Sequence, residues 1–179
     1  MVRQIELTRG KVALVDDEDY ERLAAHKWYA RAKSRYGLTY YAMRRCCNPD
    51  IHTTTVRMHR VIMDAPPGMQ VDHINGNGLD NRRDNLRLAT HSQNQANRRY
   101  KAPGKSSQFL GVSWRKREKQ WRAQIGINGK LRWLGRFDAE IDAALAYNEA
   151  ALELHGEFAS LNDIDNPGVL INVTEDNHG

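Results

Sequence analysis

The 179-residue chain has few cysteines and no long apolar segment. Its two cysteines, Cys46 and Cys47, are adjacent, which excludes a disulfide framework and a zinc site built from CxxC pairs. No run of about 18 apolar residues occurs, so we predict neither a transmembrane helix nor a membrane partner. The N-terminus lacks the apolar stretch of a secretory signal, and we therefore expect a cytoplasmic protein.

Positive charge, by contrast, is plentiful and confined to one segment. The net charge is +5. Residues 98–136 contain 12 lysines and arginines and one acidic residue, whereas residues 137–179 contain 10 acidic residues and neither lysine nor arginine. A concentrated cationic segment favours a polyanionic partner such as a nucleic acid, although a solvated basic face would have the same composition.

The hydrophobic pattern predicts an α+β protein with small cores, because only 40% of the residues are hydrophobic. Apolar alternation predicts strands, and helical spacing with capping residues predicts helices. The expected strands lie near residues 4–15, 28–32, 38–43, 71, 86–88, 110–114, 120–127 and 130–134. The expected helices begin after Asp16 or Asp17, near Met58, after Thr90 and after Asp138.

Asp72 and His73 lie where a predicted strand meets a loop rich in glycine and asparagine. A neutral imidazole can accept a proton from water near pH 7. A carboxylate with an amide oxygen, such as that of Asn94 on the following predicted helix, suits a hard divalent cation. These residues could thus hydrolyse a phosphodiester, or they could be a loop-capping carboxylate and a surface histidine.

The spacing of these residues favours the hydrolytic role. Residues 58–99 resemble the HNH endonucleases of phage and intron homing type, with Asp72-His73, Asn85 and Asn94 at the matching positions. The resemblance implies a ββα-metal fold in which His73 is the general base and Asn85 orients it. It also implies that Asp72 and Asn94 bind one Mg²⁺ or Mn²⁺ per chain.

Several neighbouring residues complete this expected site. His91 precedes Asn94 by one helical turn and is the alternative metal ligand. Arginines around the loop are expected to neutralise phosphates of the DNA backbone, which dominate such affinity. These arginines are Arg82, Arg83 and Arg87.

Residues 108–162 contain three predicted strands followed by an alanine-rich helix. Asn128-Gly129 predicts a two-residue hairpin turn between the second and third strands. Trp121, Ala123 and Ile125 share one face of the second strand by alternation, and the helix would cover them. The polar face of the sheet then remains for DNA.

This segment resembles the AP2 DNA-binding domain over its whole length, with Gly111-Val112, Trp133-Leu134-Gly135 and Asn162 among the matching positions. The resemblance implies that the sheet lies in the major groove with the helix behind it. Several DNA-contacting arginines of the plant members are replaced here, so their sequence preference does not carry over. The residues expected to contact DNA are Arg115, Arg117, Arg122, Gln124 and Trp133.

These features predict five segments along the chain: a β-rich N-terminal region (1–55), a nuclease module (56–99), a linker (100–107), an AP2-like domain (108–162) and an acidic tail (163–179). The N-terminal region could be a scaffold or an extra DNA-contacting surface. The basic residues that would suit the second role are Arg31, Lys33, Arg35, Arg44 and Arg45.

We therefore expect a site-specific endonuclease that hydrolyses double-stranded DNA, with no small-molecule substrate, in a bacterial or phage-infected cell. One active site per chain is compatible with nicking by a monomer or with double-strand cutting by a homodimer on DNA. The alternative is a non-cleaving, sequence-specific DNA-binding regulator that carries an inactive HNH remnant.

Overall fold

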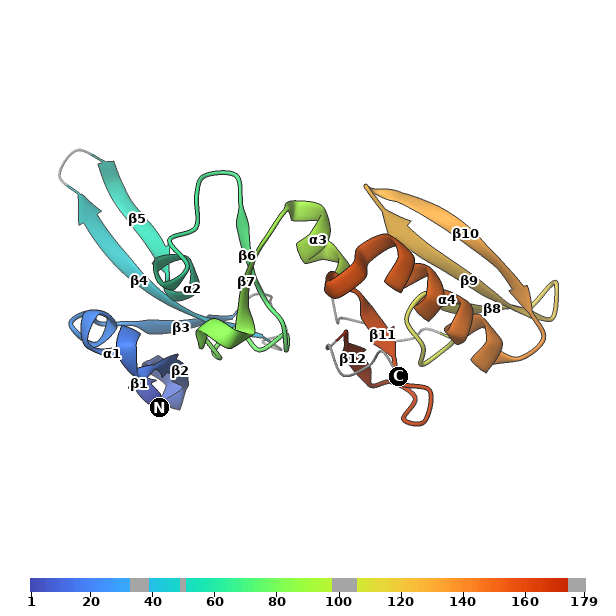
Figure 1. The fold of residues 1–179 in the computed structure, drawn as a ribbon, viewed down its shortest axis with the longest axis horizontal. Coiled ribbons are helices and arrows are strands. Elements are labelled where there is room, and N and C mark those ends of the chain that lie inside the picture. Colours follow the sequence, from blue (N-terminus) through green and yellow to red (C-terminus); the bar gives the residue numbers. More distant parts are fainter. Residues whose placement is uncertain (33–38, 49–50, 98–105, 174–179) are drawn as a thin grey trace. The chain divides into compact units, whose positions relative to one another are not determined.

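A computed structural model describes residues 1–32, 39–48, 51–97 and 106–173. The chain divides into two compact units, Met1–His91 and Ser92–Gly179, which are described separately (Figure 1). Most of the predicted linker, together with Lys33 and Arg35, lies outside the described residues. No helix in the described part of the chain is long and apolar enough to cross a membrane.

The first unit begins with an antiparallel hairpin of β1 (Val2–Glu6) and β2 (Val12–Asp16), joined by the 3₁₀ turn η1 (Thr8–Gly10). Helix α1 (Asp17–Ala24) follows directly. Two strands occur here as predicted, and Ile5 of β1 is buried. On β2, however, the buried residues are Ala13 and Val15, whereas Val12 and Leu14, which were expected to form the apolar face, are half-buried.

A three-stranded antiparallel sheet follows, with the order β3 (Tyr29–Ala32), β4 (Tyr40–Asn48) and β5 (Ile51–Arg57). Strand β4 runs beyond its predicted end near residue 43 and pairs with β5, whose β-branched residues favour a strand. Helix α2 (Met58–Ile62) begins where helical spacing was predicted.

Strands β6 (Gln70–His73) and β7 (Leu86–Ala89) form an antiparallel hairpin, and the short helix α3 (His91–Ala96) follows them. The loop between the strands ends in the 3₁₀ turn η2 (Arg83–Asn85). This is the predicted ββα arrangement. Leu14 of β2 accepts a hydrogen bond from the backbone of Asn81 (2.8 Å), so the N-terminal hairpin is bound to the loop.

One core unites the N-terminal hairpin, α1, α2 and the β6–β7 hairpin. Its members include Val15, Leu23, Met58, Val71 and Leu86, each at most 7% exposed. The N-terminal region and the nuclease module therefore pack as one body, and the first unit presents its loop from a rigid base.

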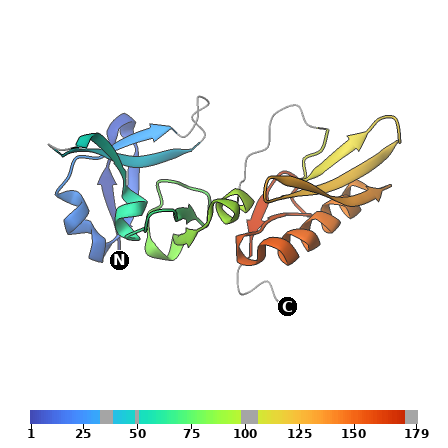
Figure 2. The ribbon, with the colours of Figure 1, turned by 90° about the horizontal axis from the view of Figure 1, so that it is seen from above.

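The second unit contains an antiparallel sheet of β8 (Val112–Arg115), β9 (Gln120–Ile127) and β10 (Lys130–Phe137), with α4 (Glu140–His155) along one face (Figure 2). The buried side chains Ala123 and Ile125 of β9 pack toward the small residues of α4. The predicted hairpin turn is confirmed, since Asn128 and Gly129 both have positive φ. Gly111 is required sterically, because a Cβ there would lie 2.1 Å from the ring of Tyr147.

The two helix caps predicted at aspartates have different outcomes: Asp16 is the N-cap residue of α1, whereas the N-cap residue of α4 is Ala139 and not Asp138. Asp16 precedes α1 but makes no side-chain capping bond, because its carboxylate accepts a hydrogen bond from the backbone of Arg83 (2.7 Å). Helix α4 begins after Ala139 rather than Asp138, whose carboxylate accepts a hydrogen bond from Gln120. Both carboxylates thus accept hydrogen bonds from residues outside the helices that they precede.

The chain after α4 is more regular than its composition predicted. The 3₁₀ turn η3 (Gly156–Phe158) leads into β11 (Ser160–Asn162), which pairs with β12 (Leu170–Asn172). The acidic tail therefore includes a strand. Its apolar residues are too few to reveal a period of two in the sequence.

Candidate functional site

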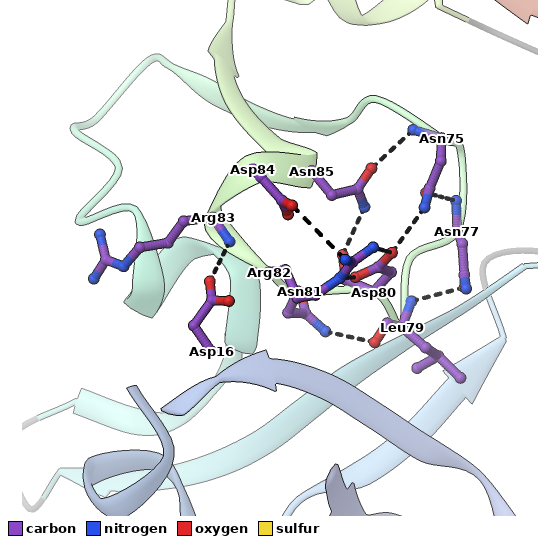
Figure 3. Close-up of polar contacts among 10 residues, drawn as sticks. All are labelled: Asp16, Asn75, Asn77, Leu79, Asp80, Asn81, Arg82, Arg83, Asp84 and Asn85. Atoms are coloured by element: carbon purple, nitrogen blue, oxygen red, sulfur yellow. Dashed lines mark hydrogen bonds and ion pairs between the residues drawn. The ribbon is translucent and has the colours of Figure 1, made fainter. Parts of the chain in front are cut away.

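The loop from residue 74 to residue 81 is held by Asn85, the last residue of η2, directly before β7 (Figure 3). Its side-chain oxygen accepts a hydrogen bond from the backbone of Asn75 (2.9 Å), and its amide nitrogen donates to the carbonyl of Asp80 (2.8 Å). Asn85 thus joins the two ends of the loop. Its predicted effect on the orientation of His73 is consistent with these bonds and stays a prediction.

Asp80 is the second anchor of the loop and is only 3% exposed. It accepts hydrogen bonds from Asn75 and from Arg82, each 2.8 Å long. The hydrogen bonds from Arg82 are the main reason that the pKa of Asp80 lies below its usual value. The carboxylate therefore stays charged and holds the loop in one conformation.

His73 lies at the end of β6 and is 5% exposed. Its Nε2 is 3.4 Å from the side-chain oxygen of Asn81. The amide nitrogen of Asn81 donates to the Leu79 carbonyl, so the oxygen is the atom that faces the imidazole. An amide oxygen only accepts, so this contact favours a proton on Nε2 and a lone pair on Nδ1.

Two further rings surround His73. The ring of His59, from α2, meets it edge-on, with centroids 5.0 Å apart and planes at 89°. The ring of Tyr41, from β4, lies 5.7 Å from His73 and 5.5 Å from His59. A triangle of aromatic rings from three elements therefore fixes the imidazole. The sequence spacing of these residues gave no sign of this cluster.

Asp72, the neighbour of His73 on β6, is 5% exposed and faces a different partner. Arg87 lies directly opposite on β7 and donates from Nε and Nη2 to one carboxylate oxygen, both at 3.0 Å. This arrangement follows the alternation of a regular strand, in which adjacent side chains point to opposite faces.

The remaining predicted metal ligands lie on α3. His91 is held at Gln70, whose amide nitrogen is 3.0 Å from its Nδ1. Asn94 is half-buried and belongs to the second unit. The sharing of one ion by Asp72 and Asn94, and the alternative with His91, stay predictions.

The chemistry of these donors suits a hard divalent cation. A carboxylate and an amide supply oxygen atoms, which Mg²⁺ and Mn²⁺ prefer, and a magnesium site keeps waters in its other positions. In the described residues no group of three or more His, Cys, Asp or Glu side chains could hold a metal.

The three loop arginines predicted to bind phosphate all contact carboxylates of the first unit. Arg82 pairs with Asp80, and Arg87 pairs with Asp72. Arg83 pairs with Asp19, which is 2% exposed, at 2.8 Å. Their role in DNA binding stays a prediction, and these ion pairs give each arginine a structural role that the sequence did not reveal.

Burial of His59 leads to a pH-dependent stability. Desolvation, with smaller contributions from His73, Arg57 and Arg60, lowers the pKa of His59 to about 3. Between that value and the ordinary pKa near 6.5, only the unfolded chain binds the proton. We expect His59 to contribute a fall in the free energy of unfolding of up to about 1.4 kcal/mol for each pH unit below 6.5.

Denaturant unfolding of the wild type and of His59→Phe across this pH range measures the contribution. Phenylalanine keeps a ring in the cluster but binds no proton. Asp19 and Asp80 titrate in both proteins, so the difference between the two pH profiles isolates His59. Parallel profiles would contradict the prediction.

The uncovered face of the second unit's sheet carries most of the residues predicted to contact DNA. Arg115, Arg117, Arg122 and Trp133 line one groove of about 550 Å³, together with Arg136. Trp133 is 48% exposed, which excludes the alternative of a core tryptophan. The guanidinium groups of Arg122 and Arg136 lie 5.1 and 5.7 Å from its ring centroid.

Gln124 lies opposite Trp133 on the neighbouring strand. Its side-chain oxygen and the Nε of Arg122 are buried atoms that lack a hydrogen-bond partner within the described residues. Such atoms require a partner, and base edges or ordered water can supply one. Arg136 was absent from the predicted contacts because the third strand was predicted to end near residue 134, whereas β10 continues to Phe137 and pairs Arg136 with Arg122.

The chain thus contains a ββα hairpin with a buried histidine, and its second unit contains a three-stranded sheet backed by a helix. The HNH endonuclease family model matches residues 56–96, and the AP2 domain model matches residues 107–157. The chain is 33% identical over 157 residues to an uncharacterized HNH endonuclease of Acanthamoeba polyphaga mimivirus. The match covers 88% of this chain and 78% of the relative. The chain therefore belongs to the HNH endonuclease family and carries an AP2 domain.

Other relatives match single parts of the chain. Protein 3.8 of Escherichia phage T7 is 38% identical over 95 residues, which is 52% of this chain and 76% of that protein. An AP2-like ethylene-responsive transcription factor of Arabidopsis thaliana is 41% identical over 58 residues, which is 32% of this chain and 12% of that protein. No solved structure matches the chain.

Proposed function

We propose that the protein is a DNA endonuclease in which His73 is the general base and the AP2 domain positions the substrate. The observation that carries this proposal is the imidazole of His73, fixed at the end of β6 by two rings and an asparagine in a member of the HNH family.

In this mechanism Nδ1 of His73 removes a proton from the attacking water, because the contact of Nε2 with Asn81 favours a proton on that nitrogen. Asn85 and Asp80 keep the loop, and with it Asn81, in place. Asp72 and Asn94 would hold the metal, and Arg87 orients the carboxylate of Asp72. The bound cation supplies charge stabilisation at the scissile phosphate and the leaving 3′ oxygen.

The AP2 sheet is proposed to bind double-stranded DNA through Arg115, Arg117, Arg122, Gln124 and Trp133. The groove that most of them line combines positive charge with an exposed indole ring. Arginine can pair with guanine and glutamine with adenine in the major groove. The acidic C-terminal segment repels phosphate and would face away from the duplex.

Incubation of the full chain with phage and plasmid DNA tests the proposed function. We expect cleavage in Mg²⁺ or Mn²⁺, its loss in chelator and its recovery when the metal is restored. Strand-resolved mapping of the products distinguishes nicking from double-strand cutting. Intact DNA across many substrates, alongside tight binding that depends on salt, would instead support the non-cleaving regulator.

Replacement of Arg115 and Arg122 by alanine should weaken DNA binding and flatten its salt dependence, because two positive charges that neutralise phosphates are lost. Arg132→Ala is the control, because Arg132 lies 3.8 Å from Glu153 of α4, on the helix side of the sheet. Binding measured over a series of salt concentrations checks the prediction. An unaltered slope in the double variant would place the basic strands off the DNA.

A further inference from the structure

A second basic groove, of about 600 Å³, lies in the first unit on the sheet of β3, β4 and β5. Its walls include three arginines and no acidic residue: Arg31, Arg57 and Arg60. Tyr41 and Thr55 also line it. The volume far exceeds that of one ion or water, so the groove suits an extended anionic ligand.

The register of the sheet explains why these side chains converge. Arg31 of β3 lies opposite Tyr41 of β4, and Arg57 of β5 lies opposite Met43 of β4. Tyr41 and Met43 are two residues apart and therefore share a face of the strand. Both arginines lie on that face, one on each side of the central strand.

The charges of these arginines are not neutralised by carboxylates within the described residues. Arg31 and Arg57 are exposed, and neither makes an ion pair there. Arg60 donates to the backbone carbonyls of Met69 and Ala65, which fixes its guanidinium without cancelling its charge. The groove thus differs from the loop around η2, where each arginine has its own carboxylate.

Tyr41 connects this groove to the site. Its ring lines the groove and also lies 5.7 Å from the ring of His73. The loop approaches the same ring so closely that a Cβ on Gly78 would come within 2.6 Å of it. Tyr41 is thus both a wall of the groove and a neighbour of the imidazole of His73.

We propose that the groove of Arg31, Arg57 and Arg60 binds the phosphate backbone of DNA next to the scissile bond. This inference rests on the proposed function and assigns a role to the N-terminal sheet. Two phosphates contact Arg31 and Arg57, while Arg60, fixed by its backbone bonds, adds a third positive charge and Tyr41 forms the wall nearest His73. The AP2 domain then provides a second, separate DNA-binding surface.

The full chain with Arg31→Gln and Arg57→Gln tests the groove, in a His73→Ala background that separates binding from cutting. The probe is a linear duplex of mixed sequence long enough to reach both units. We expect the slope of binding against salt to fall by about 2, as for two lost phosphate contacts. Hydroxyl-radical footprints should lose protection at one short stretch of backbone and keep the rest.

Two matched variants serve as controls. Arg9→Gln with Lys27→Gln removes the same charge from exposed positions of the first unit outside the groove and should leave the slope unchanged. Arg31→Lys with Arg57→Lys keeps the positive charge and should restore the slope of the His73→Ala protein. Equal slopes for the groove variant and its His73→Ala parent would overturn the inference, whether or not the wild type cuts DNA. If the wild type fails to cut DNA while the groove variant shows the expected loss of slope, only the proposed nuclease function is overturned.

Discussion

His73→Ala is expected to lower the rate of DNA cleavage by about 10²–10⁴-fold, the usual contribution of a general base. Binding to DNA should be unchanged, because the phosphate-binding groups proposed for both units are elsewhere. The side chain is 5% exposed and packs edge-on against His59, so its removal leaves a small space in the ring cluster. Single-turnover cleavage with saturating protein measures the chemical step without a contribution from affinity.

His26→Ala is the matched control, since His26 is an exposed histidine of the same unit and has no place in the proposed mechanism. Thermal unfolding of both variants shows whether the ring cluster has collapsed. A variant at position 73 that folds, binds DNA and cuts at the wild-type rate would remove the imidazole from the mechanism. The base would then have to be sought elsewhere.

The elements of the fold that depend on local pattern could be predicted from the sequence. The alternation around Trp121 and the Asn128-Gly129 turn are properties of adjacent residues, and the second unit follows them closely. Asp72-His73 could be placed at the end of a strand for the same reason. Helix α1 also starts after Asp16 as predicted, but the side-chain bonds expected at Asp16 and Asp138 were not predictable, because both carboxylates have distant hydrogen-bond partners.

The surroundings of the site could not be predicted, because they depend on contacts between residues far apart in the chain. Tyr41 reaches His73 only because β4 lies beside α2 and the loop, and Arg83 reaches Asp19 across 64 positions. The sequence alone does not distinguish an arginine that contacts a phosphate from an arginine that contacts a carboxylate. Only the fold distinguishes the two, through burial and distance.

Asn85→Ala tests whether the loop positions the base, and we expect losses in both stability and cleavage. Alanine leaves the carbonyl of Asp80, which is buried, and the backbone NH of Asn75, which is partly buried, without their partners. Each such group costs about 1–3 kcal/mol, and the buried carbonyl should account for the larger share. The loop also carries Asn81, so a shift of about 1 Å in the imidazole should slow cleavage by about 10²-fold.

Asn77→Ala is the control within the same loop, because its side chain is exposed and accepts only the hydrogen bond of Leu79. Asn85→Asp separates the two bonds, since the carboxylate still accepts from Asn75 but repels the Asp80 carbonyl. If positioning matters, both Asn85 variants cut slowly even at temperatures where they are fully folded. Normal cutting by a destabilised but folded Asn85→Ala would mean that the three-ring cluster alone holds His73, and that Asn85 serves only the fold of the loop.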